Sequence, residues 1–457
     1  MNWQPILSTP IRSIFAVGMY TNSWDPHNGY ILRSDDQGKT WESTELPFKV
    51  GGNMPGRSQG PRLVIDPNDN HVLYFGARSG NGLWKSTDSG VTWSKVNNFP
   101  NPGTYIPFPG KDYGGDPTGF SWIAFDPRTG TAGHPTQTIY AAVNDNTGDN
   151  LYRSTDGGET WAAVPGQPTG FLPHHGVLSS TGMLYISYSN GVGPYDGNKG
   201  DVWKLNTNTG TWTKISPVAS SDSNNYWGYG GLAVDPQHPD TLMVATLNSW
   251  RPDANIYRST DGGNTWSPIW QGAYPNRTLK YTMDISALPW LTFGAPYDLQ
   301  ATSPKIGWMI GDLQIDPFNS NRMMYGTGAT LYGTNNLTAW DTGGTVNISV
   351  MAKGVEETHV IDLISPPSGA HLVSAIGDIT GFRHDDLTKA PSMMFTNPYS
   401  SVTTSLDYAE LKPNVIVRVG AFDKSSNPSG KALGISTDGG TTWNPDATEP
   451  PNASGEK

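Results

Sequence analysis

Acidic side chains stand in several glycine-rich turns, where a carboxylate could exchange a proton with a bound molecule. Asp378 has a glycine on each side within three positions, and an apolar strand leads into its turn. A carboxylic acid can act as a general acid when desolvation raises its pKa. The alternative is an ordinary turn aspartate, a description that Asp385 and Asp386 also fit.

Aromatic side chains are frequent in the Gly- and Asn-rich connections and just before apolar strands. Aromatic faces stack on ring-shaped ligands such as sugars, and nearby amides, imidazoles and carboxylates can hydrogen-bond hydroxyl groups. As a set they predict a binding surface, although any single ring could instead pack between sheets. The candidate binding aromatics are Tyr105, Trp122, Trp227, Tyr229, Trp250 and Trp308.

Two adjacent histidines, His174 and His175, lie in a Pro-His-His-Gly turn ahead of an apolar strand. Neighbouring side chains on an extended strand point to opposite faces, so the pair cannot easily chelate one metal ion. We expect no metal and no cofactor. One of the two histidines is predicted to donate a hydrogen bond to a ligand, and a structural turn is the alternative.

A repeated element must position these residues, and it is visible as the pattern Ser-x-Asp-x-Gly-x-Thr-Trp. In such a hairpin turn the carboxylate can accept backbone N–H bonds, the Gly can adopt positive φ, and the Trp can pack back on the sheet. The pattern resembles the Asp box of β-propellers, so we expect its aspartates to be structural. The five copies contain Asp36, Asp88, Asp156, Asp261 and Asp438.

A second phrase, an apolar strand followed by an Asp-Pro turn, precedes most of these boxes. The two phrases together make a four-stranded unit, which is the blade of a propeller. The sequence therefore predicts an all-β fold built of β-propeller blades. The Asp-Pro turns begin at Asp66, Asp126, Asp235 and Asp316.

Counting blades along the chain gives a division into domains. About six blades are expected in residues 1–352 and about two in residues 353–446, followed by a polar tail at 447–457. The abundance of turn-forming and aromatic residues, 54 Gly, 37 Pro and 17 Trp among 457 residues, favours many short strands over long helices.

Charge and composition exclude several classes of partner. A net charge of -11 disfavours nucleic acid, which is bound by Lys and Arg. We find no apolar run of about 18 residues, so no membrane-spanning helix is expected. With no cysteine there is no disulfide, thiol nucleophile or thiolate metal site. The N-terminus has neither the basic nor the apolar region of a signal peptide.

Several long phrases are similar to those of the glycoside hydrolase family 74 xyloglucanases, and the resemblance runs over nearly the whole chain. They are residues 18–24 (GMYTNSW), 48–57 (FKVGGNMPGR), 74–84 (YFGARSGNGLW), 170–176 (GFLPHHG) and 376–382 (IGDITGF).

The resemblance implies two tandem seven-bladed propellers with xyloglucan bound between them, and hydrolysis of β-1,4-glucosidic bonds with inversion. It assigns the general acid to Asp378, in the Gly-Asp-Ile-x-Gly-Phe phrase. The family's general base lies in a Thr-Asp-Ile-Gly-Gly phrase, which this sequence lacks. We therefore expect a chain truncated at both ends and deficient in hydrolysis, with Asp25 a poor substitute because it stands in an Asp-Pro turn. A xyloglucan-binding fragment without turnover is the alternative.

The resemblance also implies a plant cell-wall polysaccharide or its oligosaccharides as the partner, an extracellular location and a monomer at full length. It leaves internal and reducing-end cleavage equally open. A sialidase also carries Asp boxes, but it needs an arginine cluster for an anionic sugar. Arg57, Arg62 and Arg78 form the only dense group, and an acidic chain is a poor host for an anion.

Overall fold

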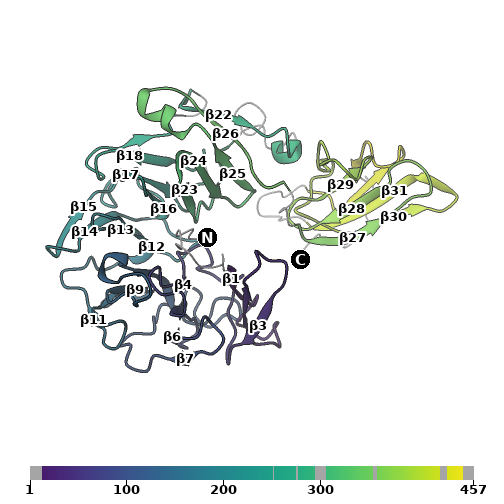
Figure 1. Cartoon of the computed structure of the whole chain (residues 1–457). Helices are drawn as coiled ribbons and strands as arrows, with labels where there is room; N and C mark the ends of the chain where they lie inside the picture. Colours follow the sequence, from purple (N-terminus) through teal and green to yellow (C-terminus); the bar gives the residue numbers. More distant parts are fainter. Residues whose placement is uncertain are drawn as a thin grey trace. The chain divides into compact units, whose positions relative to one another are not determined.

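The structure is a computed structural model that describes residues 13–250, 252–273, 276–293, 305–353, 358–421 and 430–445. Its regular elements are antiparallel strands and three short 3-10 helices (Figure 1). The chain divides into two compact units, Met1–Thr282 with Ile306–Asn347, and Met283–Lys305 with Ile348–Lys457. The all-β propeller architecture is as the repeats predict.

Five sheets of the first unit follow one another in chain order. Each pairs only neighbouring strands of the sequence. They are β1 (Ser13–Val17), β2 (Tyr30–Ser34) and β3 (Glu42–Glu45); β4 (Leu63–Ile65), β5 (Leu73–Gly76), β6 (Leu83–Ser86) and β7 (Ser94–Lys95); β8 (Phe120–Phe125), β9 (Ile139–Val143), β10 (Leu151–Ser154) and β11 (Ala162–Ala163); β12 (Leu172–Leu178), β13 (Met183–Ser189), β14 (Val202–Asn206) and β15 (Thr211–Lys214); β16 (Tyr229–Asp235), β17 (His238–Thr246), β18 (Ile256–Ser259) and β19 (Ser267–Pro268).

A sixth, five-stranded sheet has the order β22-β26-β25-β24-β23, and a small hairpin precedes it. Its strands are β22 (Tyr281–Asp284), β23 (Leu313–Asp316), β24 (Asn319–Gly326), β25 (Leu331–Thr334) and β26 (Val346–Val350), and the hairpin is β20 (Trp270–Gln271) and β21 (Thr278–Leu279). The 3-10 helices are η1 (Pro127–Thr129), η2 (Pro289–Thr292) and η4 (Leu337–Thr342).

Two sheets make up most of the second unit. They are β27 (Val360–Ile364), β28 (Leu372–Ile376) and β29 (Gly381–His384), followed by β30 (Val402–Ala409), β31 (Lys412–Ala421), β32 (Leu433–Ser436) and β33 (Asn444–Pro445). The sequence placed residues 283–305 and 348–352 in the first domain, whereas they group with the second unit. The reason is packing, because Trp290 of η2 lies 5.5 Å from the Phe382 ring. The expected tail at 447–457 lies outside the described residues.

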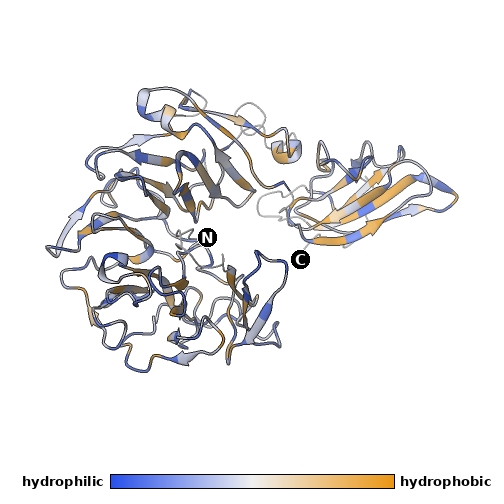
Figure 2. Ribbon diagram, viewed as in Figure 1, coloured by the Kyte–Doolittle hydropathy of each residue, from blue (hydrophilic) through white to orange (hydrophobic). Residues whose placement is uncertain are grey.

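Inner strands and intersheet cores hold the first unit together. The first strands of successive sheets are neighbours, β8 beside β12, β12 beside β16 and β16 beside β23. Apolar side chains of facing sheets interleave, as where Trp122 of β8 packs with Leu184 and Ile186 of β13. Figure 2 shows the hydrophobic residues concentrated in the strands. Each fully buried side chain of this kind contributes about 1.5 to 3 kcal/mol.

The Asp boxes are self-contained turns, as predicted. In the third box, Asp156 accepts hydrogen bonds from the backbone N–H of Thr160 at 2.9 Å, from the Thr160 hydroxyl at 2.5 Å and from Ser154 at 2.8 Å. The two Thr160 bonds and the one from Ser154 lower the pKa of Asp156 to about 2. The carboxylate is therefore committed to the turn and is not offered to a ligand.

Antiparallel pairing assigns every connection to one of two ends of the sheets. In the four-stranded sheets, the Asp-Pro turns between the first and second strands and the Asp boxes between the last two lie at one end. In the three-stranded first sheet the box follows β2, so the β1–β2 connection lies at the other end. The connections that enter a sheet, and those between its second and third strands, lie at the other end. We call the second set the ligand-end loops, because the candidate residues outside the strands lie there. None of the described helices is long and apolar enough to span a membrane.

Candidate functional site

A row of aromatic rings, linked in places by polar side chains, crosses the ligand-end loops of the first unit, and we call it the aromatic strip. At one end, Tyr20 packs edge-on against Trp24 with ring centroids 5.5 Å apart, and Trp24 stacks on Tyr113 at 6.3 Å. Trp24 is 62% exposed, so its indole is available to a ligand. The Tyr113 hydroxyl donates to the carbonyl of Asn53, which fixes the ring.

Arg57 joins this end of the strip to its middle. Its guanidinium donates to the hydroxyls of Tyr113 at 3.3 Å and Tyr195 at 2.9 Å, and it lies 5.0 Å from the centre of the Tyr195 ring. Tyr195 is 55% exposed in the connection between β13 and β14. The arginine thus holds two tyrosines from different loops in fixed positions.

Two tryptophans form the other end of the strip. The Asn248 amide donates to the Tyr195 carbonyl at 3.3 Å and accepts from the Trp250 indole at 2.6 Å. Trp250 and Trp308 then stack with centroids 5.6 Å apart and an interplanar angle of 22°. Trp250 is 41% exposed. The structure therefore brings these two predicted binding residues together, from the β17–β18 loop and the segment before β23.

Tyr105 is half-buried in the connection between β7 and β8. Burial, and then the negative charge of Asp196, raises the pKa of its hydroxyl. Burial also raises the pKa of Asp196, which accepts a hydrogen bond from the Gly193 backbone at 2.5 Å. A phenol and a carboxylate from two ligand-end loops thus lie near each other, and both can hydrogen-bond a hydroxyl group.

Three of the predicted binding aromatics belong to the core. Trp122 in β8 and Tyr229 in β16 have no exposed surface, and Trp227 is 8% exposed. The Tyr229 hydroxyl donates to the Val218 carbonyl at 2.7 Å. The structure thus places these rings between sheets, which is the alternative that the sequence left open, and no face is available for stacking.

The two histidines are also buried, in the bulged start of β12. His174 and His175 approach through their Nδ1 atoms at 3.0 Å, and His175 Nε2 lies 3.7 Å from Asp312 Oδ1. Burial lowers the pKa of His175 to about 3, so its imidazole is neutral. The Asp312 side chain is 44% exposed. Sequence reasoning missed this carboxyl, which reaches the surface beside the pair.

Asp378 lies in the second unit, in the connection between β28 and β29. It is exposed, and its backbone has a φ of 68°. Two hydrogen bonds of Thr380 stabilise the turn. Its carbonyl accepts from the Ile376 backbone N–H at 2.9 Å, and its hydroxyl donates to the Phe395 carbonyl at 2.8 Å. A positive φ is uncommon outside glycine, although Asp adopts it more often than most residues.

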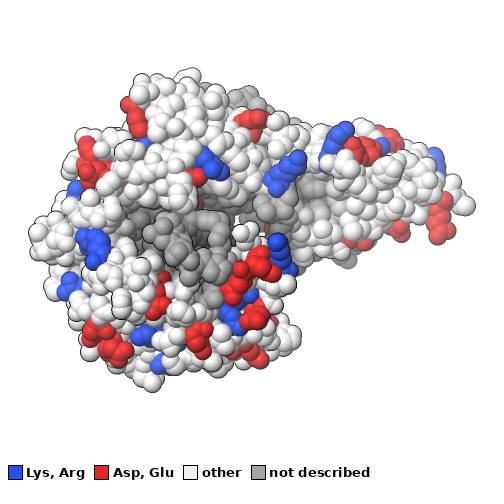
Figure 3. Space-filling model, in the orientation of Figure 1, with Lys and Arg blue, Asp and Glu red and all other residues white. Residues whose placement is uncertain are grey.

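Two arginines of the group considered for a sialidase are engaged within the protein. Arg78 is 1% exposed and bonds the Pro55 carbonyl, with Asp116 at 4.0 Å, while Arg57 is held by two tyrosines. Figure 3 shows acidic and basic side chains dispersed among uncharged ones on the face in view. The described residues contain no cluster of metal-ligating groups.

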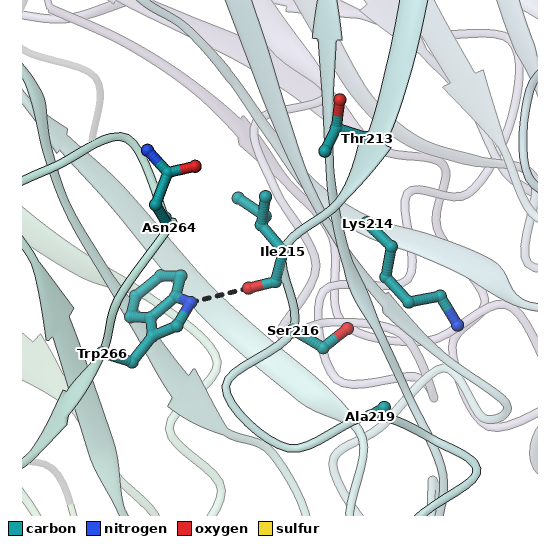
Figure 4. Close-up of a pocket in the computed structure, with 8 residues that line it drawn as sticks. Thr213, Lys214, Ile215, Ser216, Ala219, Asn264 and Trp266 are labelled. Carbon is teal, nitrogen blue, oxygen red and sulfur yellow. Dashed lines mark hydrogen bonds between the residues drawn. The ribbon is translucent and has the colours of Figure 1, made fainter.

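A hollow of about 330 Å³ lies at the opposite end of the sheets from the strip (Figure 4). The Asp-box residue Trp266 closes it by donating to the Ile215 carbonyl at 2.6 Å. This bond ties one sheet to the next, so we assign the hollow to blade packing. Its lining is Thr213, Lys214, Ile215, Ser216, Ala219, Gly263, Asn264 and Trp266.

Comparisons with known proteins agree with this architecture. A family model described as the BNR/Asp-box repeat matches residues 152–163. The chain is 65% identical to a xyloglucanase from a Paenibacillus species over 98% of its own length and 43% of that protein. It is 58% identical to a xyloglucanase from Acetivibrio thermocellus over 98% of its own length and 53% of that protein.

A crystal structure of the GH74 xyloglucanase from Xanthomonas campestris superposes with a TM-score of 0.85 at 36% identity. The match covers 96% of this chain and 59% of that one. This chain spans about half the length of the curated relatives it matches, and over that span it belongs to glycoside hydrolase family 74.

Proposed function

We propose that this chain binds xyloglucan along the aromatic strip and takes part in hydrolysing its β-1,4-glucosidic bonds. The strip carries the proposal, because exposed rings alternate with hydrogen-bonding groups from loops of successive sheets. Rings of this kind stack on the apolar faces of sugars, and the amide and phenol groups match their hydroxyls. The relatives named xyloglucanase support the same substrate.

Asp378 is the proposed general acid of an inverting reaction. Such a reaction needs a second carboxylate roughly 6.5 to 9.5 Å away to activate a water molecule. The sequence has no Thr-Asp-Ile-Gly-Gly phrase to supply it. We therefore expect binding without hydrolysis, or with slow hydrolysis, from the 457-residue chain alone, and faster hydrolysis when a segment carrying that phrase is joined to it.

The test measures new reducing ends from soluble xyloglucan, with binding measured in parallel by calorimetry. We call the chain joined to a segment with the Thr-Asp-Ile-Gly-Gly phrase the joined form. Asp378→Asn should lower the kcat of the joined form by about a hundredfold or more, because general acid catalysis contributes at least that factor. Asp385→Asn is the control, since Asp385 is exposed and paired with Arg383. Full activity in Asp378→Asn would refute the assignment of Asp378 as the general acid. If the wild-type chain does not bind xyloglucan, the proposed substrate is wrong.

The joined form also distinguishes the two modes of cleavage. A steep fall in viscosity for each new reducing end identifies internal cleavage, and a shallow fall identifies release from chain ends. We further propose an extracellular location, since a cell-wall polymer is reached outside the cell. We also propose that the full-length protein is a monomer. Fractionation of the producing cells and light scattering of the full-length protein test these two points.

A further inference from the structure

The stacked tryptophans at one end of the strip come from segments that a single buried carboxylate joins. Asp253 follows Trp250 by three residues, and its Oδ2 accepts from Ile306 N at 3.1 Å while its Oδ1 accepts from Gly307 N at 3.3 Å. These two amides immediately precede Trp308. The Ala254 amide adds a bond to the Gly307 carbonyl at 3.2 Å.

The charge of Asp253 is balanced from a third segment. Arg277 donates to Asp253 Oδ2 at 3.1 Å and lies 4.9 Å from the centre of the Trp270 ring. Trp270 in turn donates to the Ala254 carbonyl at 2.6 Å. Asp253 has no exposed surface and the Arg277 side chain is 4% exposed, so water cannot replace these bonds.

We propose that Asp253 is a positioning residue that sets the separation and tilt of Trp250 and Trp308, so that the two indoles act as one sugar-binding platform. Without the carboxylate, the amides of Ile306 and Gly307 would be buried without acceptors. The segment carrying Trp308 would then shift away from the loop carrying Trp250. The role of the platform rests on the proposed function, whereas the geometry of the pair does not.

Burial makes the Asp253 carboxyl sensitive to pH, and four charged or titratable groups face it. They are Arg277 beside β21, Tyr281 at the start of β22, Tyr325 in β24 and Tyr332 in β25. Burial raises the pKa of Asp253 to about 6, against the lowering by Arg277 and the two backbone amides. The tyrosines stay neutral because burial raises their pKa values. Below pH 6 the carboxyl gains a proton, and its bonds to Arg277 and to the backbone amides of Ile306 and Gly307 weaken.

The first test needs no ligand. Two indoles stacked at this distance couple and give a circular dichroism exciton couplet, and the difference between wild type and Trp250→Phe isolates this pair from the other tryptophans. We expect Asp253→Asn to lose most of that difference. Asp66→Asn is the control, because Asp66 is also buried and accepts two bonds from Thr136, but at the opposite end of the sheets; it should keep the couplet.

The second test compares wild type at about pH 5 and about pH 7, on either side of the Asp253 pKa. In the wild type, the couplet and the affinity for a xyloglucan oligosaccharide should both decline in acid, the affinity by about fivefold. In Asp253→Asn, both the couplet and the affinity should be weak at either pH. If the variant does not fold, the wild-type titration still decides. An unchanged couplet in the variant or in acid overturns the positioning role, whereas a pH-sensitive couplet without any binding overturns only the proposed function.

Discussion

At the scale of single residues, the position of one ring depends on the absence of one methyl group. Trp308 lies over the backbone of Gly328, where an added Cβ would be 2.3 Å from the indole Nε1. We expect Gly328→Ala to push the indole out of the stacked pair and to weaken oligosaccharide binding about fivefold, the value of one stacking contact.

The matched control is Gly326→Ala in the same sheet, where a new Cβ meets nothing within 4 Å. Isothermal titration of the two variants measures the effect. Equal affinities would mean that Trp308 does not contact the ligand.

Residue types alone could not separate binding rings from core rings. Trp250 and Trp308 were predicted as binding residues, and the structure brings them together, but the sequence did not indicate that the two rings stack. Trp122 and Tyr229 stand in similar phrases but fall within strands, where a shift of one residue exchanges the two faces of the sheet. Tyr20, Trp24, Tyr113 and Tyr195 were missed because their loops converge only through the order of the sheets.

At the scale of elements, the boxes and Asp-Pro turns could be predicted because each is a local arrangement. An Asp, a Gly and a Trp at fixed spacing contain all the donors and acceptors of the turn. A signal for the missed rings was nevertheless present. Once the boxes are assigned to one end of the sheets, antiparallel alternation assigns every second connection to the other end, and aromatics in those connections become the candidates.

The boxes also predict how the elements respond to acid. Each box aspartate has a pKa of about 2, below the usual 3.8, so its contribution to stability is present above pH 4 and is lost as pH falls through 2. We expect Asp156→Asn to lower the midpoint of thermal unfolding at pH 7, and to bring it closer to wild type near pH 2. Asp149→Asn, at an exposed position in the connection between β9 and β10, should change neither. Calorimetry at the two pH values measures this, and an equal deficit at both would contradict it.

At the scale of the whole molecule, the strip requires several sheets to be in place at once. Its rings come from the loops of successive sheets, and no single sheet contains both Tyr20 and Trp308. Binding should therefore report on assembly of the first unit, whereas Asp378 belongs to the second unit. The sequence analysis placed the boundary near residue 352. It could not indicate that residues 283–305 group with the second unit, because the contact of Trp290 with Phe382 joins distant parts of the chain.

The second unit carries an apolar strand with little cover. In β27, Val360 and Leu363 are each 49% exposed, and Figure 2 shows this strand as strongly hydrophobic. Exposed apolar strands favour pairing between copies of a chain. We expect the double variant Val360→Lys and Leu363→Lys to reduce self-association at micromolar concentrations, because two like charges oppose the contact.

Leu411→Lys, at a fully exposed turn between β30 and β31, is the control for added charge. Light scattering after size-exclusion chromatography measures the mass, and a wild-type chain that stays monomeric at every concentration would contradict the prediction.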